Sequence, residues 1–416
     1  MGRIGTRVPQ ESIRQRMNVL LRAASAAAAT AWVVGAAAAD APNAEAIAAS
    51  APTPPARCAA PADDRKANLA CAVALARHAE GEAKAGRNAE ALAEFARADR
   101  FSPDDLRFTM ARAALQLKTA SQLTPAGIEA ATRAAPDDAG LAMMDAEIGV
   151  AKKDWATALA DVDRVIARRP AALLAWEMRA TIDVAKPDFD TARVDIDRAL
   201  KIDPKSAEAL RLRGILRNNS GDIAGALADY QAAHTYQPRP TDPFVIGSTQ
   251  FLLRQFGDAA ASLATRTPPA PDGTYWRLWR YMALARLTGL ERASGALGPG
   301  TPPGTPVSWP GPVIDFFHGT IDSTVLLDFA KKSQETHDLS QVCEAHFYMA
   351  EDALLRQRAD AVGLFRQAVQ ECPANFHEYE GATAELRAMG LPLVAPGPTK
   401  AAAAVASAPA SAASAP

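Results

Sequence analysis

The sequence predicts an all-α protein in which antiparallel helix pairs stack into a superhelical solenoid. Two observations predict this fold: a proline recurs every 34 residues, and small or apolar residues stand at fixed distances before it. An interval of that length fits one helix–turn–helix unit, and such a unit buries its apolar face only against its neighbours. The recurring prolines are Pro136, Pro170, Pro204 and Pro238, and Pro103 precedes the first of them by 33 residues.

Each unit can be numbered so that its closing proline is position 32. Positions 20, 24 and 27 are then three or four residues apart, which places them on one face of the second helix. Small residues let this helix pack closely on the first, and the bulkier residue at position 24 fills the space between units. The residues are Ala91, Ala158, Ala192 and Ala226 at position 20; Phe95, Ile128, Val162, Ile196 and Tyr230 at position 24; and Ala98, Ala131, Val165, Ala199 and Ala233 at position 27.

Glycine favours a left-handed turn between two helices, and Gly86 and Gly221 stand at that point of their units. The whole pattern resembles the tetratricopeptide repeat (TPR) and predicts about six units over residues 67–266. The second unit departs from the pattern because Thr124 replaces the alanine, and the sixth has no closing proline. A final unit is predicted late in the chain from Ala361, Phe365, Ala368 and Pro373.

Residues 1–39 predict a secretory signal peptide. Five arginines precede the run AASAAAATAWVVGAAAA, which ends in small residues before Asp40. A basic head, a short apolar middle and a small-residue end are typical of a cleaved export signal. The sequence therefore predicts a periplasmic protein. Met17 is an alternative start of translation, and an uncleaved N-terminal membrane anchor is the alternative to cleavage.

The other segments differ in composition. Residues 40–66 and 392–416 are rich in alanine, proline and serine, which predicts a linker and a disordered tail. Residues 267–312 predict a helix followed by a Pro/Gly-rich loop, and residues 313–391 predict a helical region with the final unit. Without residues 1–39 the net charge is −6, because that segment holds five arginines and one glutamate. Nucleic-acid binding needs a basic surplus, so the composition predicts no nucleic-acid partner.

Four cysteines are present, and export would place them in an oxidising compartment. Cys343 falls at position 2 of the final unit and Cys372 at position 31, two ends that antiparallel helices bring side by side. We therefore predict a Cys343–Cys372 disulfide, which leaves Cys58 to pair with Cys71. A zinc site is an alternative because a histidine follows each of the two late cysteines within five residues, and unpaired thiols are a third interpretation.

The sequence predicts no catalytic site, no cofactor and no metal. His318, Asp322 and Ser323 have the residue types of a hydrolytic triad, but no nucleophile elbow or ordered spacing accompanies them. Neither a glycine-rich phosphate loop nor an HExxH zinc helix is present. Paired aspartates at positions 63, 104 and 137 precede predicted helices and are expected to cap them.

The TPR resemblance implies a concave protein-binding groove, lined by positions 2, 5, 9, 12 and 13 of each first helix. The lysine and asparagine with which chaperone-binding TPR proteins hold a carboxylate are absent from positions 5 and 9. We predict that Arg211, Phe244 and Phe251 are the anchors, so that Arg211→Glu with Phe251→Ala abolishes partner capture and leaves melting unchanged. The predicted groove residues are Met143, Glu147, Val150, Glu177, Thr181, Val184, Arg211, Ile215, Asn218, Asn219, Phe244, Ser248 and Phe251.

A second resemblance covers residues 275–390. The segments YWRLWRYMALARL, WPGPVIDFFHGTID, EAHFYMAEDALLRQRADAVGLFRQAV and NFHEYEGATAEL are similar to the carboxyl half of NlpI-type periplasmic repeat proteins. This resemblance implies a dimerising adaptor of the bacterial envelope that holds peptidoglycan hydrolases or a processing protease in its grooves. The family's prototype carries a lipid on a cysteine just after its signal, whereas Cys58 lies well past the apolar run, so membrane anchoring is not predicted.

The sequence thus predicts a non-enzymatic scaffold for envelope proteins. One alternative is an assembly factor for a secretion or pilus system, which would use the same groove for another partner. The other is an accessory subunit of an envelope hydrolase or transferase, which would show bound metal or turnover.

Overall fold

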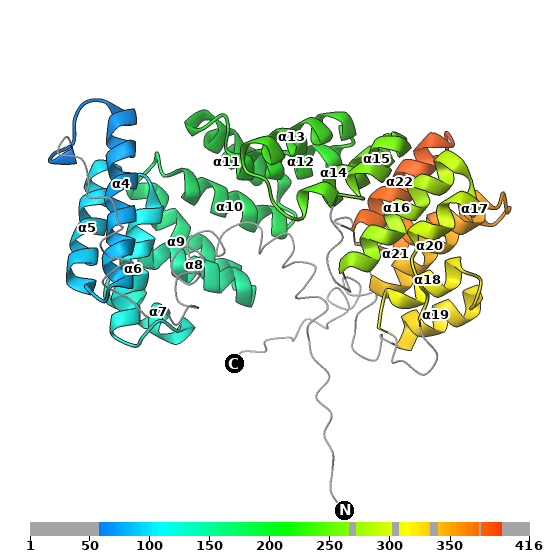
Figure 1. Ribbon diagram of the computed structural model, residues 1–416, viewed down its shortest axis with the longest axis horizontal. Coiled ribbons are helices and arrows are strands. Elements are labelled where there is room, and N and C mark those ends of the chain that lie inside the picture. The colour runs from blue at the N-terminus through cyan, green and yellow to red at the C-terminus, as the bar shows by residue number, and fades with distance from the viewer. Residues whose placement is uncertain (1–57, 266–271, 302–307, 333–339, 374–375, 393–416) are drawn as a thin grey trace, which may run out of the picture. The chain divides into compact units, whose positions relative to one another are not determined.

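The computed structural model describes residues 58–265, 272–301, 308–332, 340–373 and 376–392. The predicted signal peptide, most of the linker and nearly all of the tail lie outside these residues. Every regular element in the described residues is a helix, which confirms the predicted all-α fold (Figure 1). The chain divides into two compact units: unit 1 extends to Leu216 and includes Thr235–Gln237, and unit 2 comprises Arg217–His234 and the chain from Pro238 onward.

Unit 1 consists of helix pairs that follow one another along the chain. In three of these pairs the two helices lie side by side: α4 with α5, α8 with α9 and α10 with α11 (Figure 1). The helices are α4 (Arg65–Lys84), α5 (Asn88–Phe101), α6 (Leu106–Thr119), α7 (Pro125–Ala134), α8 (Ala139–Lys152), α9 (Trp155–Arg168), α10 (Leu173–Ala185), α11 (Phe189–Ile202) and α12 (Ala207–Ser220), which crosses into unit 2.

The residues that recur before each proline form the core. Ala91, Ala158, Ala192 and Ala226 are all completely buried, so position 20 has no room for a larger side chain. The apolar residues at position 24 are buried as well, and at position 27 only Ala131 keeps partial exposure. The spacing of four and three thus identifies the buried face of each second helix.

The ends of the helices follow from local sequence. The residue before a closing proline leaves the helical conformation, as Ala135 (φ −132°, ψ 69°) and Arg169 (φ −129°, ψ 70°) show, because the proline ring disfavours that conformation there. The second residue of each aspartate pair accepts hydrogen bonds from the first-turn N–H groups of the next helix, which confirms the predicted caps at Asp64, Asp105 and Asp138. The turn glycines Gly86 and Gly221 have φ of 80° and 88°.

The second unit differs for a reason visible in its sequence. Thr124 occupies position 20, and its hydroxyl caps α7 by accepting from the Gly127 N–H. Pro125 then starts the helix, so α7 has only 10 residues, whereas α9 and α11 have 14 each.

Unit 2 is held together by aromatic side chains. Trp279 is completely buried, stacks on Phe347 at 5.6 Å between ring centroids and meets Phe251 edge-on at 5.4 Å. Gly381 lies so close to Phe347 that a Cβ there would fall 2.6 Å from the ring. The elements of unit 2 after α12 are α13 (Ile223–Tyr236), α14 (Asp242–Leu252), α15 (Phe256–Ser262), α16 (Asp272–Thr288), α17 (Leu290–Ala293), the 3-10 helix η2 (Ser294–Ala296), α18 (Gly311–Phe317), α19 (Ser323–Lys332), α20 (Ser340–Leu355), α21 (Ala361–Glu371) and α22 (His377–Ala388).

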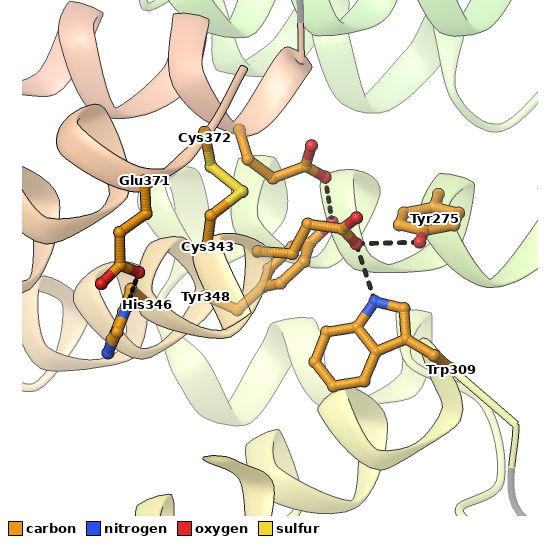
Figure 2. The surroundings of a disulfide bond; sticks show 9 residues. Tyr275, Trp309, Cys343, His346, Tyr348, Glu371 and Cys372 are labelled. Carbon is orange, nitrogen blue, oxygen red and sulfur yellow. Dashed lines mark hydrogen bonds and ion pairs between the residues drawn. A yellow bond between two sulfur atoms is a disulfide. The ribbon is translucent and has the colours of Figure 1, made fainter. Parts of the chain in front are cut away.

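The four cysteines form two disulfides, Cys58–Cys71 and Cys343–Cys372. Figure 2 shows the second one joining the start of α20 to the residue that follows α21, with a Cα–Cα distance of 5.0 Å. Beside it, His346 Nδ1 lies 2.6 Å from Glu371 Oε2. Sulfurs bonded to each other cannot act as zinc ligands, so the structure supports the disulfide interpretation of these cysteines.

We expect that replacing Cys343 and Cys372 with serine lowers the free energy of unfolding by about 3 kcal/mol, because the bridge closes a long loop in the unfolded chain. Replacing Cys58 and Cys71 is the matched control: only 13 residues separate them, against 29 in the other pair, so the loss should be slightly smaller. Urea unfolding measured with and without reductant checks both values. A midpoint that reductant leaves unchanged would contradict the prediction.

Candidate protein-binding surface

The predicted groove residues of unit 1 lie on α8, α10 and α12, and they differ in how much surface they offer. Met143, Val150 and Thr181 are buried in the helix packing, and the Thr181 hydroxyl donates to the Glu177 carbonyl within α10. The half-buried members in unit 1 are Glu147, Glu177, Val184 and Ile215, and Asn219 of α12, which belongs to unit 2, is half-buried as well. The four residues of unit 1 keep enough surface to touch a partner, and they remain its predicted contacts.

Arg211 and Asn218 are more enclosed than the sequence suggested. Only 9% of Arg211 is exposed, and its Nη2 donates to the Gln237 carbonyl, so the guanidinium is used within unit 1. Asn218 is 8% exposed on the same helix. Arg211 therefore has a structural role, and its part in partner binding stays a prediction.

The α14 residues lie in the aromatic core of unit 2. Phe251 is 1% exposed and Ser248 2%, so neither offers a surface to another protein in this structure. Phe244 is half-buried, with its ring 5.7 Å from Trp276 and 5.2 Å from His377. The sequence placed Phe244 and Phe251 on a groove wall, and the structure uses both to pack α14 on α16 and α22.

Two carboxylates at position 9 stand out in unit 1, Glu147 on α8 and Glu80 on α4. Each has a buried Oε1 without a hydrogen-bond partner among the described residues. Burial raises the pKa of Glu147 to about 7. Burial also raises the pKa of Glu80 to about 7, although Lys84 and Arg77 oppose the shift. Glu80 was not predicted, yet it occupies the same repeat position as Glu147, and aligning the first unit with the third would have found it.

The raised pKa of Glu147 gives a prediction for stability. Its carboxyl binds a proton more tightly in the folded chain than in the unfolded one, so stability should fall as pH rises from about 4.5 to about 7. We expect Glu147→Gln to remove this fall, which amounts to about 1–3 kcal/mol. Urea unfolding at pH 4.5 and pH 8 measures it, with Glu291→Gln at an exposed position as the control. Equal effects of the two variants at both pH values would refute the assignment.

The structure does not show a catalytic triad formed by His318, Asp322 and Ser323. The Nε2 atom of His318 is hydrogen-bonded to the Gly298 carbonyl oxygen at 3.0 Å. Asp322 accepts a hydrogen bond from the Val325 N–H at the start of α19. In the part of the chain that the structure describes, no group of three or more histidines, cysteines or acids could hold a metal ion. None of the helices described there is both long and apolar enough to cross a bilayer.

Comparison with known proteins gives likeness in structure only. No family model and no curated protein sequence matches the chain. Similar solved structures include a tetratricopeptide repeat protein from Parabacteroides merdae (16% identity, 54% of this chain, 90% of that chain, TM-score 0.36) and a thermophilic TPR protein from Thermus thermophilus (19%, 53%, 99%, 0.28). Yeast Tom70 is a third (12%, 79%, 56%, 0.26).

Scores this low carry no functional argument. The fold follows instead from the chain's own helix pairs, their buried repeat positions and their closing prolines. On these grounds the chain is an all-α protein of tetratricopeptide-type helix pairs.

Proposed function

We propose that this protein is a non-enzymatic scaffold that holds another protein against the first helices of unit 1. The observation that carries the proposal is the half-buried row on α8 and α10, where Glu147, Glu177 and Val184 keep accessible surface at repeat positions that face a partner in TPR proteins. Such a surface offers both apolar contact and hydrogen-bond acceptors to a bound chain.

We further propose that the scaffold works in the bacterial envelope and resembles NlpI-type adaptors. Two disulfides are compatible with an oxidising compartment. The spaced aromatics behind the resemblance include Trp309 and Tyr275, and both donate hydrogen bonds of 2.8 Å to Glu344 of α20 (Figure 2). The proposed partners are peptidoglycan hydrolases or an envelope protease, and the proposed assembly is a homodimer.

A pair of valine substitutions tests the surface. Val184→Glu puts a charge on the proposed binding row of α10, and Val194→Glu puts the same charge on α11, where Val194 is 66% exposed. The amount of partner that co-purifies from periplasmic extract should fall at least tenfold with the Val184 variant and stay unchanged with the Val194 variant. If both variants retain the partner and both are folded, the binding row is wrong.

The identity of the captured protein decides between the proposed roles. A hydrolase or protease would support the adaptor, and a component of a secretion or pilus system would support the assembly factor. Light scattering of the purified chain tests the homodimer directly.

A further inference from the structure

Unit 1 contains a charge cluster in which an arginine is held between two carboxylates. In the fourth repeat, Arg179 of α10 donates from Nε and Nη2 to the two oxygens of Asp195, both at 2.7 Å. Its Nη1 donates to Asp163 of α9, also at 2.7 Å. The arginine is at position 7 of its repeat, Asp195 is at position 23, and Asp163 is at position 25 of the repeat before.

The third repeat has the two acids and lacks the arginine. Asp161 of α9 is at position 23, and Glu129 of α7 is at position 25 of the preceding repeat. Position 7, however, is Asp145 of α8. The fifth repeat has the full set of residue types in the same register, namely Arg213, Asp229 and the preceding Asp197. Of these three successive repeats, the third therefore has an acid where the next two have a guanidinium.

A polar pocket of about 400 Å³ lies at this place and is lined by Glu129, Asp145 and Asp161 among others. Asp161 is only 3% exposed, and its Oδ2 has no hydrogen-bond partner among the described residues. Burial raises the pKa of Asp161 to about 6, a shift that Arg164 opposes and Asp145 reinforces. Burial and the nearby Glu129 also raise the pKa of Asp145, which is 7% exposed, although a hydrogen bond with Thr132 and the charges of Arg133 and Lys152 oppose the shift. The pocket thus holds carboxylates in an environment that disfavours their charge.

The remaining charges of the pocket are engaged with the protein or lie in solvent. Arg164 pairs with Oδ1 of Asp161, and Lys152 pairs with Glu129. Asp154 caps α9 through Thr157, and Arg133 is exposed. None of these contacts occupies Oδ2 of Asp161.

We propose that this pocket binds a guanidinium group, the arginine side chain of a partner protein, in the place that Arg179 fills in the next repeat. A guanidinium presents several N–H donors in one plane and can bridge two carboxylates, as Arg179 does. An ammonium group has a point charge and lacks this fork. The protein source of the arginine rests on the proposed scaffold function, whereas the pocket's preference for guanidinium does not.

The test uses the full chain without its signal and the probe N-acetyl-arginine amide, with binding followed by calorimetry and by the rise in melting temperature. The arginine probe should bind saturably. N-acetyl-lysine amide should bind at least tenfold more weakly, and the uncharged N-acetyl-citrulline amide should not bind measurably. If the arginine probe does not bind, or the citrulline probe binds equally well, the proposal is overturned.

Two variants locate the binding. Asp145→Arg introduces the residue type that the next two repeats have at position 7, so it should fill the pocket, raise the melting temperature and abolish probe binding. Asp190→Arg makes the same charge change at a side chain that is 94% exposed, and it should leave binding unchanged. Asp161→Asn removes one carboxylate without adding bulk and should weaken binding of the arginine probe at least tenfold. This second variant keeps the test valid if Asp145→Arg does not fold.

Undiminished probe binding in Asp161→Asn or in a folded Asp145→Arg variant would place the guanidinium elsewhere and overturn the proposal. Retained partner capture in a folded Val184→Glu variant, together with normal probe binding in the unmodified chain, would overturn the scaffold surface and leave the guanidinium pocket standing. The two proposals can therefore fail separately.

Discussion

Replacing Arg286 with methionine is expected to lower the free energy of unfolding by about 3–5 kcal/mol at pH 8. Arg286 of α16 is nearly buried, donates to Glu351 of α20 at 2.7 Å and lies 3.2 Å from Glu385 of α22. Glu351 is completely buried, and burial raises its pKa while Arg286 opposes that shift. Methionine would fill most of the volume but would leave two buried carboxylates facing each other without a cation.

The control for this prediction is Arg254→Met. Arg254 also pairs with Glu385, at 3.2 Å, but nearly half of its side chain is exposed, so its loss should cost less than about 1 kcal/mol. Urea unfolding measures both variants. The deficit of Arg286→Met should shrink toward pH 5, because the buried Glu351 carboxyl, with its raised pKa, then takes up a proton. If the two variants lose the same stability at pH 8, the buried network is not what holds these three helices.

Replacing Phe251 with alanine is expected to cost about 3–5 kcal/mol, the range for removing a large ring from a packed core. The ring lies 5.2 Å from Phe256 and 5.4 Å from Trp279, and the side chain is 1% exposed. The sequence suggested a groove anchor whose removal leaves melting unchanged, and this burial replaces that expectation with a clear loss of stability.

Phe244→Ala is the comparison within the same helix. Phe244 is half-buried, so it should cost less than Phe251→Ala. Thermal unfolding followed by circular dichroism ranks the two variants. An unchanged melting temperature for Phe251→Ala would restore the surface interpretation of that residue.

The helices could be predicted because the boundaries and the buried face of each helix depend on residues that are close together in the sequence. Three features depend on neighbours close in the sequence: a non-helical residue before a closing proline, an aspartate cap, and buried small residues at positions 20 and 27. A single sequence therefore reveals them. The Cys343–Cys372 bridge followed from the same numbering, since positions 2 and 31 are the two adjacent ends of one helix pair.

What the sequence could not reveal depends on contacts between distant segments. Glu351 lies 65 residues from Arg286 along the sequence, and Glu344 lies 69 residues from Tyr275. No local sequence pattern therefore predicts these pairs. The predicted groove positions describe one idealised unit, whereas the burial of Met143 and Phe251 depends on the helices that pack on them. The difference at Asp145 could have been found from the sequence, because the next two repeats have Arg179 and Arg213 at the same position.

The measurement that tests the scaffold most directly is site-specific photo-crosslinking in living cells. A photoreactive amino acid at position 184 lies on the proposed binding row of α10, and the same residue at position 194 projects from the exposed face of α11. We predict one dominant crosslinked protein from position 184 and none from position 194. The same crosslinks from both positions, or none from either in a folded protein, would contradict a partner held by the first helices.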